Sequence, residues 1–376
     1  MTFDRLSAVV DAAIGDGAFP GAVVLVSSKG RLVFHQAFGS RSVVPSRTPM
    51  TPDMVFDLSS LTKPLATTTA LLTYVRDGRL RLDDRVTRWL PNFGVHGKFH
   101  MTVRDLLAHC SGLAAHRDFW KEIARVERSG RLNFVASHGA KDWLYQQLDR
   151  ERVEYEPGSK SVYSDLGFMV LGELIELLAQ ASLDRVCHER VFRPLGLKST
   201  AFLDLAQLKL RRLSPVASII VPTEQCPWRH RVLCGEVHDD NAYAMGGVAG
   251  HAGLFANAAD VDALVTRLVA CWHGEDDFLP PALVREAWTR DGRVRGSTWA
   301  LGWDTPAPSG YSAAGTKLDR DGVGHLGFTG TSVWIDLARR AHVVFLTNRV
   351  HPSRTNDRIR DVRPKVHDAA TEALDA

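Results

Sequence analysis

Residues 20–38, PGAVVLVSSKGRLVFHQAF, decide the fold. Residues 20–28 form an apolar run rich in valine, residues 31–38 alternate, and Lys29-Gly30 lies between the two runs. This pattern predicts two antiparallel strands joined by a tight turn. Three more short strands are predicted near the other end of the chain, at residues 324–330, 332–336 and 342–347. Strands are therefore expected at both ends of the chain.

The middle of the chain has apolar side chains at helical spacing instead. The 3.6-residue period is found in residues 60–76, 102–108, 141–149, 165–180 and 182–191. Terminal helices are expected over residues 3–15 and from about Pro364, because proline suits the first turn of a helix.

Together these patterns predict an α/β (α+β) fold. An antiparallel β-sheet is built from both chain ends and flanked by the terminal helices, and a mostly α-helical domain is inserted between them. The expected domains are residues 1–60 with 250–376 for the sheet, and residues 61–249 for the helices and long loops.

Composition and charge exclude several classes of function. The 376 residues carry 46 Lys and Arg against 43 Asp and Glu, a net charge of +3, and the basic residues are scattered. Nucleic acid is therefore not an expected partner. No apolar run reaches the ~18 residues that a membrane span needs. The five cysteines form no C-x-x-C pair and the N-terminus does not have the pattern of a secretory signal, so we expect a cytoplasmic protein.

The segment Asp57-Leu-Ser-Ser60-Leu-Thr-Lys63-Pro64 carries the first candidate for chemistry. Side chains three residues apart on a helix share one face, so the amine of Lys63 can reach the hydroxyl of Ser60. The dipole at a helix start disfavours an ammonium ion and favours a developing alkoxide. This arrangement suits a serine nucleophile with a lysine base. The alternative is an ordinary solvated helix start.

The second candidate, Tyr163-Ser164-Asp165, follows Pro157-Gly158 and precedes an apolar helix. Loops that enter a helix direct side chains outward into clefts. A phenol placed there can pass protons between nucleophile, lysine and leaving group. The alternative is that Asp165 only caps its helix.

The third candidate is Gly324-His325-Leu-Gly327-Phe328-Thr-Gly330, on a predicted strand. Glycines inside a strand often mark close approach of a ligand or another backbone. An edge strand can hold a substrate carbonyl and supply one donor to an oxyanion hole. The alternative is a bent strand with a solvent-facing histidine. A similar triplet, His251-Ala-Gly253, is interpreted as a turn before a helix cap.

In this order and spacing, the three segments resemble the motifs of the penicillin-recognising serine hydrolase superfamily. That superfamily includes class C β-lactamases, D-alanyl-D-alanine peptidases and β-lactamase-like esterases, with motifs S-x-x-K, Y-x-N and K-T-G or an H/W-x-G variant. The resemblance extends over about residues 5–350 and includes four supporting stretches: residues 103–113, Pro157-Gly158, Gly246–Gly250 and Leu301–Asp304.

The resemblance implies a role for each motif residue. Ser60 would be the acylated nucleophile, Lys63 its base and Tyr163 the proton relay. The backbone N–H groups of Ser60 and Phe328, beside Gly327, would form the oxyanion hole. The implied reaction is acyl transfer to Ser60 followed by hydrolysis, with no metal and no cofactor.

Two departures from the family pattern bear on specificity. Asp165 stands where asparagine is usual, and a carboxylate near Lys63 favours the ammonium form, which is a poorer base. Either Tyr163 then carries more of the proton abstraction, or Asp165 points away from Lys63. His325 stands where β-lactamases and peptidases usually have lysine. A histidine is mostly neutral at pH 7 and therefore anchors a substrate carboxylate poorly.

We therefore expect a carboxylesterase for neutral acyl esters. The alternatives are a β-lactamase or D-alanyl-D-alanine carboxypeptidase, an acyltransferase, and a non-catalytic ligand-binding member of the fold. The expected partner is a small ester, amide or β-lactam; the sequence does not predict an oligomeric state.

Two remaining groups of residues are given structural interpretations. Residues 236–241, EVHDDN, could suggest a metal cluster, but no second histidine stands at a supporting interval, so a polar loop that borders the cleft is expected. Trp299 and Trp303 could line an acyl pocket, although large aromatics at strand spacing are more often core.

Overall fold

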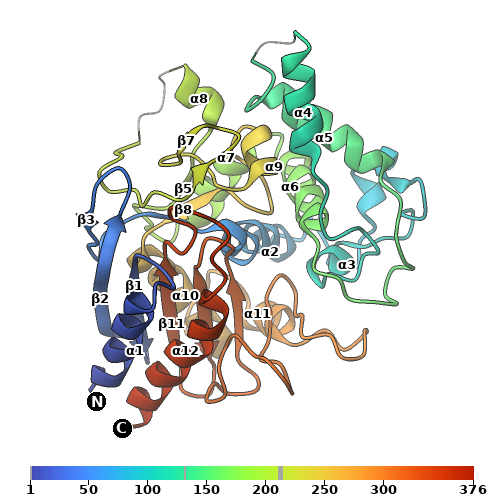
Figure 1. Ribbon diagram of the computed structural model, residues 1–376. Coiled ribbons are helices and arrows are strands. Elements are labelled where there is room, and N and C mark those ends of the chain that lie inside the picture. The colour runs from blue at the N-terminus through green and yellow to red at the C-terminus, as the bar shows by residue number, and fades with distance from the viewer. Residues whose placement is uncertain (1, 131–132, 211–214) are drawn as a thin grey trace.

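The predicted hairpin forms the second and third strands of a six-stranded antiparallel sheet in the computed structural model, which describes residues 2–130, 133–210 and 215–376 (Figure 1). The strand order is β3-β2-β1-β11-β10-β9. The N-terminal strands are β1 (Gly21–Ser28), β2 (Arg31–Ser42) and β3 (Thr48–Pro49). The C-terminal strands are β9 (Val323–Leu326), β10 (Ser332–Asp336) and β11 (Ala341–Thr347). The pairing of β1 with β11 confirms that both chain ends build one sheet.

Helices cover both faces of this sheet. The terminal helices α1 (Asp4–Gly15) and α12 (Ile359–Asp375) lie side by side on one face, and α10 (Ala258–His273) covers the other (Figure 1). Side chains of β1 alternate between these layers, because successive residues of a strand point to opposite faces. Val24 packs with α1 and α12, whereas Val23 belongs to the main core that includes α10.

The final helix begins earlier than the sequence predicted. It starts at Ile359, five residues before Pro364, so the proline lies inside the helix. Pro364 has no N–H group to donate to the carbonyl of Arg360. The hydroxyl of Tyr311 donates to that carbonyl instead, at 2.8 Å. This substitute donor explains how the helix tolerates an interior proline.

The helices of the middle region agree with the predicted periodic segments. Residues 60–76 form three consecutive pieces: a 3₁₀ turn η1 (Ser59–Leu61), a π-helical segment η2 (Lys63–Thr68) and α2 (Thr69–Arg76). The other predicted segments correspond to α3 (Val103–Leu107), α5 (His138–Arg150), α6 (Asp165–Ala179) and α7 (Leu183–Cys187), which continues as the π-helical η5 (His188–Phe192).

The remaining elements are short. The helices are α4 (Phe119–Arg128), α8 (Leu205–Lys209), α9 (Asp240–Ala244) and α11 (Pro281–Trp288), and the 3₁₀ turns are η3 (Val86–Arg88) and η4 (Pro91–Gly94). One small sheet has the order β4-β8-β5, with β4 (Phe56–Asp57), β8 (Leu254–Ala256) and β5 (Ala201–Phe202). A second pairs β6 (Gln225–Cys226) with β7 (Arg231–Val232).

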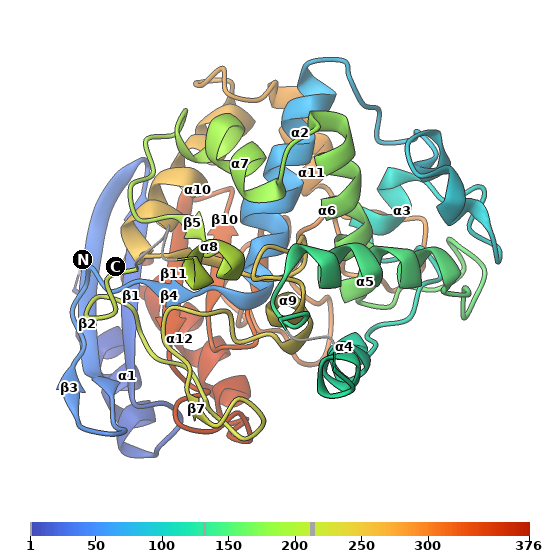
Figure 2. The ribbon, with the colours of Figure 1, turned by 90° about the horizontal axis from the view of Figure 1, so that it is seen from above.

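The division into two domains stays a prediction. Figure 2 shows the helices α2 to α7 beside the six-stranded sheet. The sheet β4-β8-β5 joins strands from the two predicted domains, because β5 falls within residues 61–249 and its partner β8 within residues 250–376. The two parts are therefore connected by backbone hydrogen bonds as well as by the chain.

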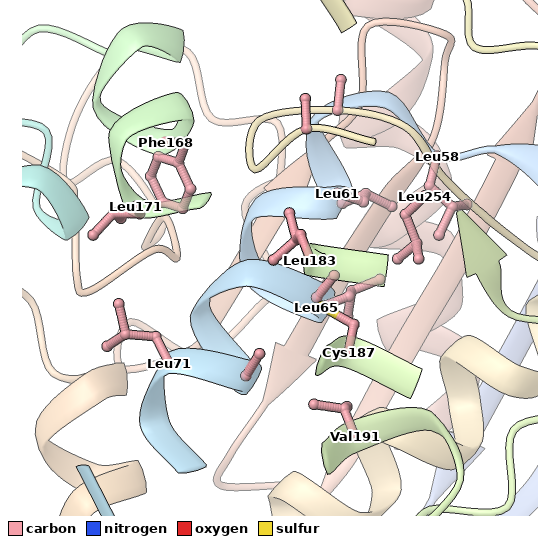
Figure 3. Packing of buried hydrophobic residues seen from close by; sticks show 14 of the residues in the cluster. Leu58, Leu61, Leu65, Leu71, Phe168, Leu171, Leu183, Cys187, Val191 and Leu254 are labelled. Atoms are coloured by element: carbon pink, nitrogen blue, oxygen red, sulfur yellow. The ribbon is translucent and has the colours of Figure 1, made fainter. Parts of the chain in front are cut away.

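A buried apolar cluster supports the segment that carries Ser60 and Lys63. Leu58, Leu61 and Leu65 come from this segment and are at most 1 % exposed. They belong to the same cluster as Leu183 and Cys187 of α7 (Figure 3). Burying a leucine side chain contributes roughly 1.5–3 kcal/mol. The backbone around Ser60 is thus fixed by packing on the side away from solvent.

No single helix among the described residues is long and apolar enough to cross a membrane. Two consecutive helical segments, Asp165–Ala179 and Leu183–Phe192, reach that length and composition together, but they are bent by 75°.

Candidate active site

A cavity of about 590 Å³ opens at the β9 edge of the sheet. Six of the seven residues predicted for the site line it: Ser60, Tyr163, Asp165, His325, Gly327 and Phe328. The seventh, Lys63, is fully buried and contacts Ser60 directly. The structure therefore brings together three segments that are about 100 and 160 residues apart in the chain.

The ammonium group of Lys63 has three hydrogen-bond acceptors. Its Nζ lies 3.0 Å from Ser60 Oγ, 2.8 Å from Asp165 Oδ1 and 3.0 Å from the carbonyl oxygen of His251. An ammonium group has three N–H donors, so all of them are used. In this state Lys63 donates to Ser60 and cannot accept its proton. A lysine base must lose one proton first.

Asp165 opposes that loss. Burial alone lowers the pKa of Lys63, but the charge of the Asp165 carboxylate, its hydrogen bond with Lys63 and the contact with Tyr163 together outweigh burial and raise the pKa above its ordinary value of 10.5. Burial likewise raises the pKa of Asp165, but Lys63 and a hydrogen bond with His116 outweigh it and hold that pKa well below its usual range. Asp165 thus remains an anion beside the proposed base. The alternative that it caps its helix is wrong, because Ser164 is the N-cap residue of α6 and accepts from the N–H of Gly167.

Tyr163 lies next to both groups. Its hydroxyl interacts with Ser60 and Lys63, and the Lys63 Nζ is 4.8 Å from the centre of its ring. Burial raises the pKa of Tyr163, and the charge of Lys63 lowers it only in part. The phenol therefore keeps its proton at neutral pH and can donate it to a leaving group.

The turn between β9 and β10 is fixed against the Ser60 segment by side-chain hydrogen bonds. Thr329 donates to the carbonyl of Asp57 at 2.8 Å, and Thr331 donates to that of Leu58 at 3.0 Å. The backbone N–H of Phe328 also points toward the Ser60 segment and donates to Ser59 Oγ at 3.3 Å. A substrate carbonyl held by this N–H must therefore displace the Ser59 hydroxyl.

His325 is buried and neutral. Its Nδ1 lies 2.8 Å from the carbonyl oxygen of Leu326, which accepts a hydrogen bond from the ring, and its side chain is almost completely enclosed. Burial, followed by the charge of Lys63, lowers its pKa to about 3. Its ring packs near Tyr163 and Trp299. The alternative of a solvent-facing histidine is therefore wrong.

The structure corrects the interpretation of His251 and divides the two tryptophans. The backbone of His251 is not only a turn before a cap, because its carbonyl accepts from Lys63. The carbonyl of His251 can approach Lys63 because the preceding residue, Gly250, packs tightly against α6. A Cβ atom on Gly250 would lie 2.1 Å from the carbonyl oxygen of Phe168. Trp299 lines the cavity and stacks on Tyr163, whereas Trp303 is buried in the core.

Residues 236–241 border the cavity through His238, Asp239 and Asp240. Asp239 pairs with the ring of His251 at 2.9 Å, and Asp240 pairs with Arg354 at the same distance. Among the described residues, no group of three His, Cys, Asp or Glu side chains is arranged to hold a metal ion. The absence of a metal and of a cofactor in the reaction stays a prediction.

Sequence reasoning missed several residues of this site, and four of them bear on its chemistry. They are Ser59, His116, Arg349 and Arg363, all of which line the cavity. His116 contacts Asp165, with its Nδ1 3.3 Å from Oδ2. None of the four belongs to a recognised motif, although Ser59 adjoins one. Arg349 and Arg363 follow β9 by more than 20 residues, so the sequence alone does not indicate that they lie close to that strand in the fold.

Comparison with known proteins identifies the family of this chain. The sequence model described as Beta-lactamase matches residues 6–366, nearly the whole chain. The chain belongs to the β-lactamase family. The expected resemblance is thereby confirmed, and the family is one of serine hydrolases.

Relatives of this β-lactamase-family chain include peptidase-like proteins. One, from Escherichia coli (strain K12), is named "Putative D-alanyl-D-alanine carboxypeptidase" and is 30 % identical over 360 residues, which cover 89 % of this chain and 80 % of the relative. Another with the same name, from Salmonella agona (strain SL483), is 30 % identical over 369 residues, or 92 % and 82 % of the two chains.

A solved structure confirms the fold. EstCE1, described as a hydrolase with promiscuous acyltransferase activity, superposes with a TM-score of 0.71 at 24 % identity, covering 96 % of this chain and 97 % of EstCE1. This β-lactamase-family chain therefore has the β-lactamase/transpeptidase fold. The roles assigned to Ser60, Lys63 and Tyr163 stay predictions.

Proposed function

We propose that this chain is a carboxylesterase that cleaves esters of uncharged acyl groups through an acyl-enzyme on Ser60. The observation that carries this proposal is the contact of Ser60 Oγ with the fully buried Lys63 Nζ, at 3.0 Å, on the wall of the cavity. A hydroxyl within hydrogen-bond distance of an amine, with a phenol beside both, is the constellation of an activated nucleophile.

The proposed reaction has two steps. Lys63, after losing one proton, accepts the proton of Ser60 as Oγ bonds to the ester carbon, and the carbonyl oxygen becomes an anion held by the N–H groups of Ser60 and Phe328. The C–O bond to the alcohol then breaks, and the alcohol leaves with a proton passed from Lys63 through Tyr163. Water attacks the acyl-enzyme in the same way and releases the acid. An alcohol in place of water makes the same site an acyltransferase.

The preference for an uncharged acyl group rests on His325. At the position where the K-T-G form of the family motif has lysine, this chain has a neutral ring, because burial and Lys63 lower the pKa of His325 to about 3. A neutral, enclosed imidazole attracts a carboxylate weakly. Strand β9 thus favours substrates without a negative charge next to the scissile bond.

Covalent labelling tests the proposed nucleophile. Incubation with a fluorophosphonate is expected to add one adduct mass to the intact protein, and Ser60→Ala is expected to abolish it. Ser59→Ala is the matched control, because this neighbouring hydroxyl faces the same cavity; its adduct should persist. No adduct on the unaltered protein would instead support a non-catalytic binding member of the fold, and an adduct that survives in Ser60→Ala would place the nucleophile elsewhere.

A second candidate function is favoured by two buried arginines. Arg349 and Arg363 line the cavity and are each 7 % exposed. Arg349 donates to the carbonyl of Phe328, and Arg363 donates to those of Gly327 and Thr331. Within the described part of the chain, neither forms an ion pair with a carboxylate, and the Nε of Arg363 has no hydrogen-bond partner.

Buried cations without an anion are costly, so such a pair favours a negatively charged ligand. Burial lowers the pKa of Arg363 to about 10, which still leaves the guanidinium charged at neutral pH. A substrate carboxylate near this end of the cavity is the chemistry of D-alanyl-D-alanine peptides and of β-lactams. The second candidate is therefore a carboxypeptidase or β-lactamase.

The variant Arg363→Gln separates the two candidates. If Arg363 anchors a carboxylate, kcat/KM for a D-alanyl-D-alanine peptide or nitrocefin should fall about 10- to 100-fold, the cost of a lost hydrogen bond to a charged group. The value for p-nitrophenyl acetate should change about twofold or less. Equal losses on both substrates would show that Arg363 only holds the β9–β10 turn, and strong ester cleavage without peptide or nitrocefin turnover would support the esterase.

A further inference from the structure

Asp165 lies between two basic side chains. Its Oδ1 is 2.8 Å from Lys63 Nζ, and its Oδ2 is 3.3 Å from His116 Nδ1. The exposed fraction rises along this row, from 0 % for the side chain of Lys63 to 18 % for Asp165 and 47 % for His116. One carboxylate therefore connects the buried amine with a histidine that is open to solvent.

The two basic groups compete for this carboxylate. A proton on His116 offsets the charge of Asp165, and the attraction that keeps Lys63 in its ammonium form becomes weaker. Coupling between two binding events is reciprocal, so a proton on Lys63 also disfavours one on His116. The pair can hold a single proton on either residue. Only the form with the proton on His116 leaves Lys63 free to act as a base.

We propose that His116 is a positioning residue that controls, through Asp165, how firmly Lys63 holds its proton. This inference rests on the acyl-enzyme function proposed above. It also offers a physical reason for the aspartate at this position: a carboxylate can be neutralised from the solvent side by a histidine, whereas an asparagine side chain carries no charge to neutralise.

The other groups that face the triad have partners of their own. Asp118 lies 3.4 Å from His116 Nε2 but bonds to Lys121 at 2.7 Å, and Asp239 pairs with His251 at 2.9 Å. On the inner side, Lys63 is faced by Tyr163, His109 and His325; burial and the charge of Lys63 lower the pKa of both histidines. Asp165 is thus the one carboxylate in the described structure that contacts both Lys63 and His116.

The direction of the pH effect follows from this coupling. The hydrogen bond with Asp165, more than any other contact, raises the pKa of His116 above 6.5. Near neutral pH the unaltered protein can therefore reach the active form by moving one proton from Lys63 to His116. Without His116, Lys63 must lose its proton to the solvent, and the active fraction falls about tenfold for each pH unit below the pKa of Lys63.

The rate of fluorophosphonate labelling, followed by intact mass between about pH 6 and pH 10, tests the proposal. His116→Gln should label about tenfold more slowly than the unaltered protein near pH 7, and at the same rate near pH 9.5. In an Asp165→Asn background, where no shared charge remains, His116→Gln should have no further effect. His138→Gln is the matched control, because His138 is 62 % exposed and pairs with Asp204 at 3.1 Å outside the cavity; its rate should not change.

Two outcomes would overturn the proposal. An equal loss of rate at every pH would show that His116 only supports its loop, and an undiminished loss in the Asp165→Asn background would show that it does not act through the carboxylate. Titration of the His116 ring by NMR gives an answer that does not depend on activity. The pKa of His116 should fall in Asp165→Asn. An unchanged pKa would refute the coupling, even if the fluorophosphonate labels Ser60. A lower pKa in a protein that the fluorophosphonate does not label would refute only the proposed function.

Discussion

Replacing Lys63 by methionine is expected to slow acylation of Ser60 by about 10²- to 10⁴-fold, the range contributed by a general base. Methionine keeps an unbranched chain in a site that is 0 % exposed but has no amine 3.0 Å from Ser60 Oγ. Tyr163 cannot replace it, because burial raises the pKa of the phenol. The rate of acylation is measured by stopped-flow release of p-nitrophenol from p-nitrophenyl acetate.

The same change is expected to destabilise the protein in a pH-dependent way. Removing one partner of a buried ion pair costs about 3–5 kcal/mol, because the other charge stays buried. With Lys63 present, the pKa of Asp165 is lowered in the fold, so the pair stabilises the protein above the ordinary aspartate pKa and this contribution is lost as the pH falls. With methionine, burial raises that pKa, so the variant is most destabilised at high pH.

Urea unfolding near pH 5 and near pH 8 tests the direction of this pH dependence. The difference in unfolding free energy between the unaltered protein and Lys63→Met should be larger near pH 8. The double variant Lys63→Met with Asp165→Asn is the control, since it removes both charges and should recover stability without recovering acylation. Recovery of acylation as well would show that the amine is not the base.

The parts of the site that could be predicted are local in the sequence. The contact of Ser60 with Lys63 follows from one turn of helix, and the close approach of residues 324–330 to other parts of the backbone follows from their glycines. The strand predicted there is too long, because β9 ends at Leu326 and residues 327–330 form a turn. The antiparallel sheet was predictable because short strand-like runs occur at both chain ends, and β1 and β11 are indeed paired. Each run is recognised from a few adjacent residues.

The contacts that could not be predicted join residues far apart in the sequence or use backbone atoms. His116 and Asp165 are separated by 49 residues, and nothing around His116 indicates that its ring meets the carboxylate. The carbonyl of His251 has no residue-type signal, because every residue has one. The early start of α12 is a third case: an interior proline is tolerated only because Tyr311, from a distant loop, donates to Arg360.

Gly327→Ala is expected to lower kcat/KM for p-nitrophenyl acetate by about 10²- to 10³-fold, the loss seen when one oxyanion donor is removed. A Cβ atom on Gly327 would lie 2.0 Å from Thr331 Oγ1 and 2.5 Å from the carbonyl oxygen of Leu58. Thr331 donates to that same carbonyl, so the methyl group would enter the contact that holds β9 against the Ser60 segment. The N–H of Phe328, one residue further, would move away from Ser60.

Gly327→Ala should lose most of its activity while most of the protein remains folded. Overpacking of this kind costs about 1–3 kcal/mol, which leaves most of a domain of ordinary stability folded. Gly292→Ala is the matched control, because its Cβ would meet nothing within 4 Å, and both its stability and its activity should be unchanged. If Gly327→Ala unfolds at lower urea yet keeps its kcat/KM, the glycine serves only packing, and the oxyanion donor must come from a backbone group other than that of Phe328.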